Sequence, residues 1–345
     1  MLARLLDRSV YQQRLLVRSC KGNLPEAFRD AGVSIEQMGD GRLFDPAILA
    51  RAIRAARAFK PHIVHGAVFE GIGAAVVAGR ACGARVVVEE TSHATNRSRL
   101  GHALFRGLAA LSDACVAISP AVADYLVEVT AVPRSKVTVI TNGVFAPELP
   151  SEDVTRLRPA LGLSSESFVV GTVCRLNDDS HKRVSDLLKA MVLLADQPIE
   201  LLIVGEGPQR GWLEDMSRDL GVAERVRFAG YRDDVGSAYA AMDVFALVSA
   251  REGFGLVVAE AMLAGLPVVA TAVGGIRDIV EAGRTGTLVE PGDVPAIAGA
   301  LRELAAAPER RRAFAAAGRS RAQQHFSAER YARDVDEFYR RLLKR

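Results

Sequence analysis

Several features that mark common protein classes are scarce or missing in this 345-residue sequence. It has only four cysteines, without a Cys-x-x-Cys pair, so we expect no zinc or redox site of that kind and predict free, buried thiols in a reducing compartment. No apolar run is long enough to cross a bilayer, and the N-terminus MLARLLDRSVYQQ lacks the apolar segment of a secretory signal. From these absences we expect a cytoplasmic protein.

A strong charge of one sign is also lacking. The formal net charge is +3, but residues 1–150 carry 18 Lys and Arg against 13 Asp and Glu, an excess of five. No basic run is interleaved with aromatic residues, which argues against a nucleic-acid partner. The excess would suit a weak peripheral contact of the N-terminal half with anionic lipid on the inner membrane face. A solvated basic surface without a partner is the alternative.

Two ligand-binding signatures are incomplete. The stretch IVGEGPQR has Gly205 and Gly207 after an expected strand, but Arg210 stands where a dinucleotide fingerprint needs its third glycine. This excludes an NAD-type site, and a tight strand-to-helix turn explains the glycines. No Asp-x-Asp pair follows a strand, so we predict no metal site.

What is present is an alternation of short β-branched runs with longer amphipathic runs, repeated twice. This order predicts parallel sheets covered by helices. A segment rich in proline and turn formers, TNGVFAPELPSED, separates the repeats. We therefore predict an α/β protein of two doubly wound, Rossmann-like domains, 1–145 and 151–327, facing a cleft. A capped amphipathic helix over 328–345 would pack back toward the first domain.

The second repeat contains two glutamates around a glycine turn, in SAREGFGLVVAEAMLAG. Gly253 and Gly255 would let the backbone approach a ligand, and the helix that follows would offer free N–H groups to a diphosphate. Eight residues of helix rise about 12 Å, so Glu252 and Glu260 could bind separate hydroxyl-bearing parts of one ligand. A chance pair on a solvated helix face is the simpler reading of the glutamates alone.

Two cations follow the first strand of this repeat, in CRLNDDSHKR. The carboxyl ends of parallel strands face the ligand crevice, so Arg175 and Lys182 could neutralise a diphosphate leaving group. Two ordinary surface cations are the alternative.

Taken together, these motifs resemble the donor domain of the retaining glycosyltransferases of family 4, which have the GT-B fold. The resemblance covers about residues 140–345 and includes CRLNDDSHKRVSDLLKA, LLIVGEGPQRGWLE, the glutamate segment with VATAVGGIRDIV, and GTLVEPGD. It implies that Arg175 and Lys182 bind the donor diphosphate, Glu252 the donor sugar and Glu260 the ribose. Further donor contacts are expected from Gly205, Gly253, Phe254, Gly255 and Leu256. Arg183 stands where the family usually has a glycine.

The first repeat resembles the acceptor domain of the same family. PHIVHGAVFEG is similar to its DIVHxH strand, with Ala67 in place of the second histidine. The resemblance makes His93 a catalytic candidate, with Glu90 as the alternative, whereas Ser119 and Asn142 could line the cleft or form caps and turns. The strand and Gly-Gly loop with which family members open are not found here, where a helix-like LARLLDRSVYQQ comes first.

The function expected from the resemblance is sugar transfer from a nucleoside diphosphate sugar to a hydroxyl of a glycan or lipid-linked acceptor, without a metal or cofactor. Polysaccharide or lipid-linked glycan synthesis would be the setting. A non-catalytic GT-B subunit that binds a nucleotide sugar is a second hypothesis, favoured by the absent Gly-Gly loop. A nucleotide-sugar epimerase is a third.

Overall fold

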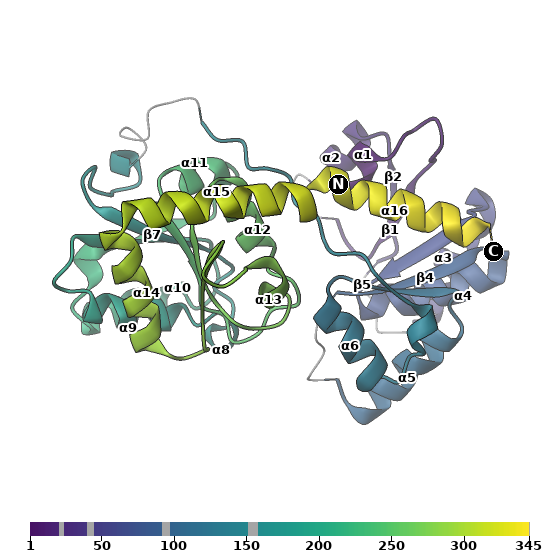
Figure 1. Ribbon diagram of the computed structural model, residues 1–345. Helices are drawn as coiled ribbons and strands as arrows, with labels where there is room; N and C mark the ends of the chain where they lie inside the picture. The colour runs from purple at the N-terminus through teal and green to yellow at the C-terminus, as the bar shows by residue number, and fades with distance from the viewer. Residues whose placement is uncertain (21–23, 40–44, 92–96, 151–157, 345) are drawn as a thin grey trace. The chain divides into compact units, whose positions relative to one another are not determined.

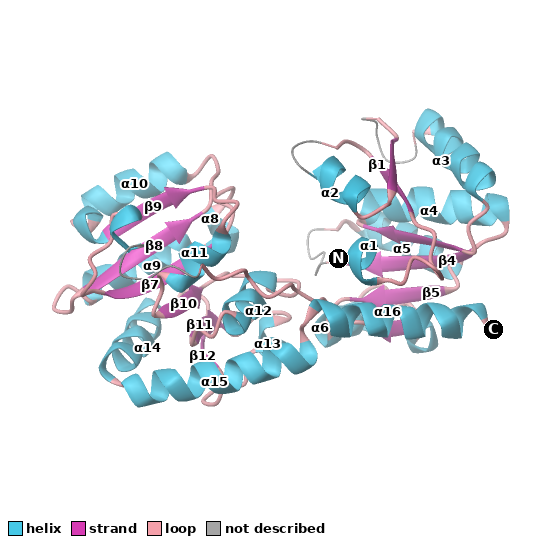
Figure 2. Cartoon of the chain, turned by 90° about the horizontal axis from the view of Figure 1, so that it is seen from above, coloured by secondary structure: helices cyan, strands magenta, loops and turns pink. Residues whose placement is uncertain are grey.

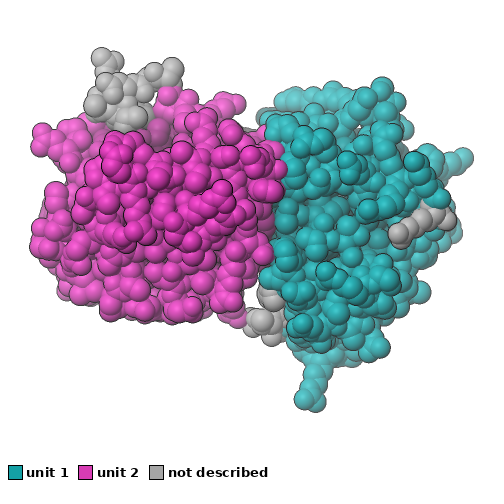
Figure 3. Space-filling view, viewed as in Figure 1, with its two compact units in different colours: residues 1–143, 328–345 teal, residues 144–327 magenta. Residues whose placement is uncertain are grey.

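A computed structural model describes residues 1–20, 24–39, 45–91, 97–150 and 158–344. The chain divides into two compact units, which Figure 3 distinguishes by colour. Unit 1 comprises Met1–Gly143 and Ala328–Arg345, and unit 2 comprises Val144–Ser327. Each unit is described separately below.

The strands of unit 1 are all parallel and form two sheets. A two-stranded sheet pairs β1 with β2, and a four-stranded sheet has the order β3-β4-β5-β6. Strand bounds are β1 (Arg14–Val17), β2 (Ser34–Gln37), β3 (Ile63–Ala67), β4 (Arg85–Glu90), β5 (Ala114–Ala117) and β6 (Val137–Val139). The described residues contain no ladder between β1 and β3, and an apolar cluster joins Leu16 and Met38, from and next to the two-stranded sheet, to α3 (Pro46–Phe59) and α4 (Phe69–Cys82).

Helices alternate with these strands. They are α1 (Leu2–Leu5), α2 (Leu24–Asp30), α3 (Pro46–Phe59), α4 (Phe69–Cys82), α5 (Arg99–Ala110), α6 (Pro120–Glu128), the 3-10 turn η1 (Arg134–Lys136) and α16 (Ala328–Leu343). Helix α3 begins where its sequence predicts, because the Asp45 carboxylate accepts a hydrogen bond from the Ala47 N–H. The expected N-terminal helix is much shorter than LARLLDRSVYQQ: α1 ends at Leu5, where Leu6 turns to extended backbone.

The C-terminal helix α16 belongs to unit 1, where it lies beside the four-stranded sheet (Figure 1). Its buried side chains Val335, Phe338 and Leu342 join those of β4, β5 and the residue after β6 in one apolar cluster. A polar contact adds to this packing, because the Tyr339 hydroxyl lies 2.7 Å from Nδ1 of His65. The histidine of the PHIVHG motif therefore anchors α16 to β3.

Unit 2 is built on one six-stranded parallel sheet with the order β12-β11-β10-β7-β8-β9. Its strands are β7 (Phe168–Val173), β8 (Ile199–Val204), β9 (Val226–Gly230), β10 (Val244–Leu247), β11 (Val268–Thr271) and β12 (Gly286–Val289). The order runs outward from β7 in one direction and from β10 in the other, which is the doubly wound Rossmann topology. The order reverses between β7 and β10, so the loops after these two strands flank the usual ligand crevice.

Helices cover both faces of this sheet (Figure 2). They are α8 (Asp179–Lys182), α9 (Val184–Leu193), α10 (Arg210–Asp219), η2 (Ala223–Arg225), α11 (Val235–Ala240), α12 (Leu256–Leu263), α13 (Ile276–Ile279), α14 (Val294–Ala306) and α15 (Pro308–His325). An apolar cluster of described residues joins one face of the sheet to α9, α10 and α14. Strands buried on both faces read as continuous apolar runs, which is why LLIV and VFAL are so uniform.

The prediction of an α/β chain with two Rossmann-like domains is confirmed. The alternation of strands and helices expected for the second repeat is present in unit 2. In unit 1 the sequence analysis missed β2, since SIEQ has a single apolar residue and offers no periodicity to detect.

Candidate functional site

The glycine turn before α12 lies in the loop after β10, at the point where the strand order of unit 2 reverses. Gly255 has φ of 101°, a left-handed conformation that side chains rarely adopt, and it is the residue from which α12 starts. The first turn of α12 has no side-chain cap, and its Val258 N–H donates to the Gly255 carbonyl at 2.9 Å, so the N–H groups of Leu256 and Val257 are the ones left for a ligand. The exposed Leu256 opens this turn to solvent. An anion at this position would be stabilised by the N–H groups and the helix dipole.

Glu252 and Lys182 come together at this turn. The Lys182 Nζ lies 2.5 Å from Oε1 of Glu252, across 70 residues of sequence. The Ser249 hydroxyl donates to the same carboxylate oxygen at 2.8 Å. The ammonium and carboxylate side chains are 28% and 13% exposed, so both are held by the protein yet open on one side. A cation that follows β7 is therefore paired with the acidic turn; its role toward a diphosphate stays a prediction.

The two loops are also joined by their backbones. The Ala250 N–H donates to the His181 carbonyl at 2.7 Å, which holds the Lys182 turn against the Glu252 turn. Arg183, the residue in the family's glycine position, has φ of 53°, a conformation that explains why glycine is usual there. Its guanidinium donates to the buried Asp186 at 2.6 Å. Arg183 thus adopts the left-handed backbone of the turn and pairs with a residue of α9, and its Nε is not free for a ligand.

Arg175 lies two residues beyond β7 with an exposed side chain, and among the described residues it has no hydrogen-bond or ion-pair partner. Its loop is shaped by Gly205, which also follows a strand at this crevice. A Cβ on Gly205 would lie 1.8 Å from the Cys174 carbonyl oxygen, and one on Gly207 would lie 2.3 Å from that of Leu176. The close backbone approach gives Gly205 a supporting role for the Arg175 loop; a donor contact of its own stays a prediction.

Glu260 lies on α12 in the fifth residue of the helix, so the expected separation of eight helical residues is wrong. The helix starts only at Leu256 because the glycine turn occupies the residues before it. The buried Tyr239 hydroxyl donates to Glu260 Oε2 at 3.0 Å. Burial raises the pKa of Glu260, an effect that the tyrosine hydrogen bond only partly offsets. The partly buried Glu260 carboxylate is thus hydrogen-bonded to Tyr239 through Oε2.

Phe254 anchors the glycine turn to the interior of unit 2. Its side chain is buried, with its ring centroid 5.7 Å from that of Phe326. Only its backbone can therefore meet a ligand, as the resemblance implies for the residues of this turn. The same holds for Gly253 and Gly255, which have no side chain.

The site residues predicted in unit 1 are His93, Glu90, Ser119 and Asn142. His93 falls in residues 92–96, outside the described part of the chain. Its alternative, Glu90, is buried and accepts a hydrogen bond from Arg97 at 2.8 Å. Ser119 caps α6 through the Val122 N–H at 3.2 Å, and the Asn142 carbonyl accepts from Arg330 at 3.0 Å. These contacts of Glu90, Ser119 and Asn142 each stabilise the fold of unit 1.

The remaining predictions concern thiols and metals. All four cysteines are free, but only Cys115 is fully buried, whereas Cys20, Cys82 and Cys174 are partly buried. Burial raises the pKa of Cys174 to about 11, so this thiol near the Lys182 turn is protonated at neutral pH. Within the described residues no group of three His, Cys, Asp or Glu side chains could hold a metal ion. None of the described helices has both the length and the hydropathy required to span a bilayer.

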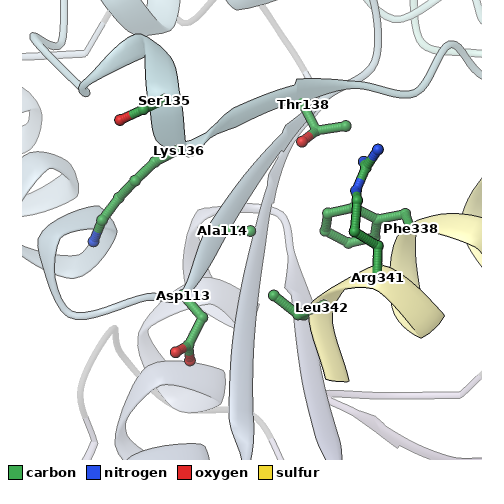
Figure 4. A pocket seen from close by; sticks show the side chains of 8 residues that line it. All are labelled: Asp113, Ala114, Ser135, Lys136, Thr138, Phe338, Arg341 and Leu342. Atoms are coloured by element: carbon green, nitrogen blue, oxygen red, sulfur yellow. The ribbon is translucent and has the colours of Figure 1, made fainter. Parts of the chain in front are cut away.

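A cavity of about 210 Å³ lies in unit 1, between the start of β5, η1 and the end of α16 (Figure 4). The Lys136 ammonium at its edge donates to the carbonyls of Ala109, Ala110 and Ser112, so it caps the end of α5. Asp113 binds the Val86 N–H and Arg85. These groups serve the fold, and the cavity is in a different unit from Glu252.

Comparisons with known proteins agree across the chain. The family described as Glycosyltransferase Family 4 matches residues 1–145, and that described as Glycosyl transferases group 1 matches residues 167–307. Among curated proteins, the chain is 28% identical over 287 residues to N-acetyl-alpha-D-glucosaminyl L-malate synthase of Bacillus anthracis, covering 81% of this chain and 74% of that one. It is 36% identical over 230 residues to D-inositol 3-phosphate glycosyltransferase of Corynebacterium urealyticum, covering 61% and 52%. The matched region spans about half the length of several curated relatives.

Solved structures show the same fold. Anabaena Alr3699/HepE in complex with UDP-glucose superposes with a TM-score of 0.85 at 22% identity, covering 95% of this chain and 99% of that one. A glycosyltransferase from Rickettsia africae superposes with a TM-score of 0.88 at 18% identity, covering 99% and 93%.

Proposed function

The chain belongs to the GT-B glycosyltransferases of the family 4 type, and from this we propose that it moves a sugar from a nucleoside diphosphate sugar to a hydroxyl of an acceptor. One observation carries the proposal: the Lys182–Glu252 pair lies beside the uncapped start of α12, at the strand-order reversal of unit 2. A cation and free N–H groups suit a diphosphate, and a carboxylate suits sugar hydroxyls.

In this proposal the bond between the anomeric carbon and the diphosphate breaks, and the acceptor oxygen bonds to the same face of that carbon. Lys182, Arg175 and the α12 N–H groups stabilise the charge that develops on the leaving diphosphate. A phosphate oxygen of the donor takes the acceptor proton, so no protein base is needed. Retention of the anomeric configuration follows, and proton NMR of the product would test it.

We extend the proposal to a hexosyl donor that reacts without a metal ion or separate cofactor. The two cations and the helix start would provide the positive charge that the diphosphate needs. A UDP-sugar is the first candidate, because the solved complex named above contains UDP-glucose. The acceptor would be a growing glycan or a lipid-linked glycan, as the name of a relative from Rhizobium meliloti, lipopolysaccharide core biosynthesis mannosyltransferase LpsB, suggests. The names of the two curated relatives given above contain L-malate and D-inositol 3-phosphate instead, so small hydroxyl compounds are the alternative acceptors.

A thermal-shift panel of nucleoside diphosphates and their sugar conjugates tests the donor site. A ligand at 100 times its Kd stabilises the folded state by about 2.7 kcal/mol, and we expect the matching nucleotide to raise the Tm by about 5 °C or more. If no nucleotide raises the Tm, the donor-site assignment is wrong. Binding without transfer to any acceptor would instead favour the non-catalytic subunit.

Two variants control that panel. Glu260→Ala removes the carboxylate proposed to bind the ribose, so the nucleotide-induced shift should largely disappear. Glu260→Gln keeps an oxygen that can accept from Tyr239, and should retain more of the fold's intrinsic stability while also binding nucleotide weakly.

We also propose that the protein works in the cytoplasm with unit 1 in peripheral contact with the inner membrane face. Helix α5 supports this, since Leu100 is 79% exposed and the neighbouring Arg99 and Arg106 are exposed as well. Exposed leucine and arginine side chains on one helix suit an anionic lipid surface. We expect sedimentation with phosphatidylglycerol vesicles but not phosphatidylcholine vesicles, and loss of binding in Leu100→Ser/Arg106→Ser. Equal sedimentation with both lipids would contradict the electrostatic part of this proposal.

A further inference from the structure

The buried hydroxyl of Ser249 lies directly behind the proposed donor-sugar carboxylate. Ser249 follows β10 and is fully buried, and its Oγ donates to Oε1 of Glu252 at 2.8 Å. Lys182 binds the same oxygen at 2.5 Å. Both contacts therefore fall on Oε1, and within the described part of the chain Oε2 of Glu252 has no hydrogen-bond partner. The lone pairs of Oε2 are left for a ligand hydroxyl.

The position of Ser249 is itself fixed. Thr271, the fully buried last residue of β11, donates its hydroxyl to the Ser249 carbonyl at 2.6 Å. The hydroxyl of Ser249 has a single proton, which forms the hydrogen bond to Glu252. Thr271 thus holds the backbone of Ser249, and the separate hydroxyl of Ser249 holds the Glu252 carboxylate.

Lys182 is less firmly committed to Glu252 than Ser249 is. Its ammonium is on a flexible stem, has three N–H donors and is partly exposed. A diphosphate entering the site would take one or more of those donors. Ser249 is then the contact of Glu252 that the ligand does not share.

We propose that Ser249 is a positioning residue for sugar transfer: it holds Oε1 of Glu252 so that Oε2 faces the donor sugar while Lys182 serves the diphosphate. The inference rests on the proposed function, and it adds which residue orients the Glu252 carboxylate. Thr271 acts one step further back, by fixing the backbone of Ser249.

The test separates sugar recognition from diphosphate recognition. It uses the nucleoside diphosphate and sugar conjugate that stabilise the wild-type chain most, beginning with UDP and UDP-glucose. Ser249→Ala should bind the nucleoside diphosphate within about twofold of the wild type. It should hydrolyse the sugar conjugate, with water as the acceptor, about 10- to 100-fold more slowly, as expected for a lost hydrogen bond to a charged group. Ser249→Thr, which keeps a hydroxyl, should recover much of the rate.

Two further variants keep the test decisive. Ser217→Ala removes another buried hydroxyl of unit 2, which donates to the Glu214 carbonyl at 2.7 Å on α10, and it should leave hydrolysis unchanged. Thr271→Val keeps the side-chain shape and should slow hydrolysis less than Ser249→Ala does.

The outcomes are distinct. If the wild-type chain binds neither probe nor any other pair of the panel, the proposed function fails and this inference fails with it. If the wild type binds and Ser249→Ala hydrolyses as fast as Ser217→Ala, only the role of Ser249 is refuted. Equal loss of affinity for the diphosphate and the sugar conjugate would also refute it, because a general disturbance of the site would then explain the variant.

Discussion

Replacing Lys182 with methionine is expected to slow sugar transfer by about 100- to 1000-fold, the usual effect of removing one group that stabilises charge in a transition state. The ammonium is 2.5 Å from Glu252, at the loop that flanks the start of α12, where the proposed diphosphate leaves. Methionine keeps most of the unbranched stem but removes the charge. The rate of donor hydrolysis at saturating donor, measured with purified protein, checks this expectation.

A matched substitution separates the loss of charge at the site from the loss of a lysine in general. Lys189 lies on α9 of unit 2, and its ammonium is 3.4 Å from the carboxylate of the buried Asp186. Lys189→Met should change the rate by less than about twofold, since Arg183 still pairs with Asp186 at 2.6 Å and the half-exposed Lys189 is distant from Glu252 in the chain. Lys182→Arg keeps the charge and should fall between the two. Wild-type rates in Lys182→Met would show that the leaving group is stabilised elsewhere.

The second large effect is expected for Gly274→Ala. Gly274 has φ of 44°, and a Cβ at this position would lie 1.8 Å from the carbonyl oxygen of Glu252. The loop after β11 therefore supports the Glu252 turn through a backbone contact that only glycine permits. We expect a loss of about 3 kcal/mol in the free energy of unfolding, about 1 kcal/mol of it from the strained backbone and the rest from the overlap.

Gly283→Ala is the control for that substitution. Gly283 has φ of 76°, but no atom lies within 4 Å of its hypothetical Cβ, so the variant measures backbone strain without a clash. Its urea midpoint should fall by about a third as much as that of Gly274→Ala. Gly274→Ala should also lose nucleotide-sugar binding because Glu252 is displaced, whereas Gly283→Ala should keep it. Similar midpoints for the two variants would contradict the support that we assign to Gly274.

Much of the site could be predicted because its residues occur in short motifs. The glycine turn before LVVAEAML and the positions of Lys182 and Arg175 after a strand are local patterns. Ser249 and Thr271 were missed, since a serine or threonine at a strand end looks like an ordinary capping or turn residue. The hydrogen bond from Thr271 to Ser249 joins residues 22 apart, and no local signal marks such a pair. The bond from Ser249 to Glu252 spans only three residues, so the spacing Ser-x-x-Glu was a local signal that could have been used. His65 was noticed only as part of a motif, and its contact with Tyr339 spans 274 residues.

The sequence by itself determined the two-domain α/β architecture and the regions that form the donor motifs, because hydrophobic periodicity and turn residues act over a few neighbours. Only the tertiary structure decided the order of the strands, which brings the loops of β7 and β10 together, and the residues through which α16 binds unit 1. It also decided which oxygen of Glu252 is occupied and why Gly274 must lack a side chain. These depend on distances between segments remote in the chain, which are set when the sheet assembles and its loops pack against one another.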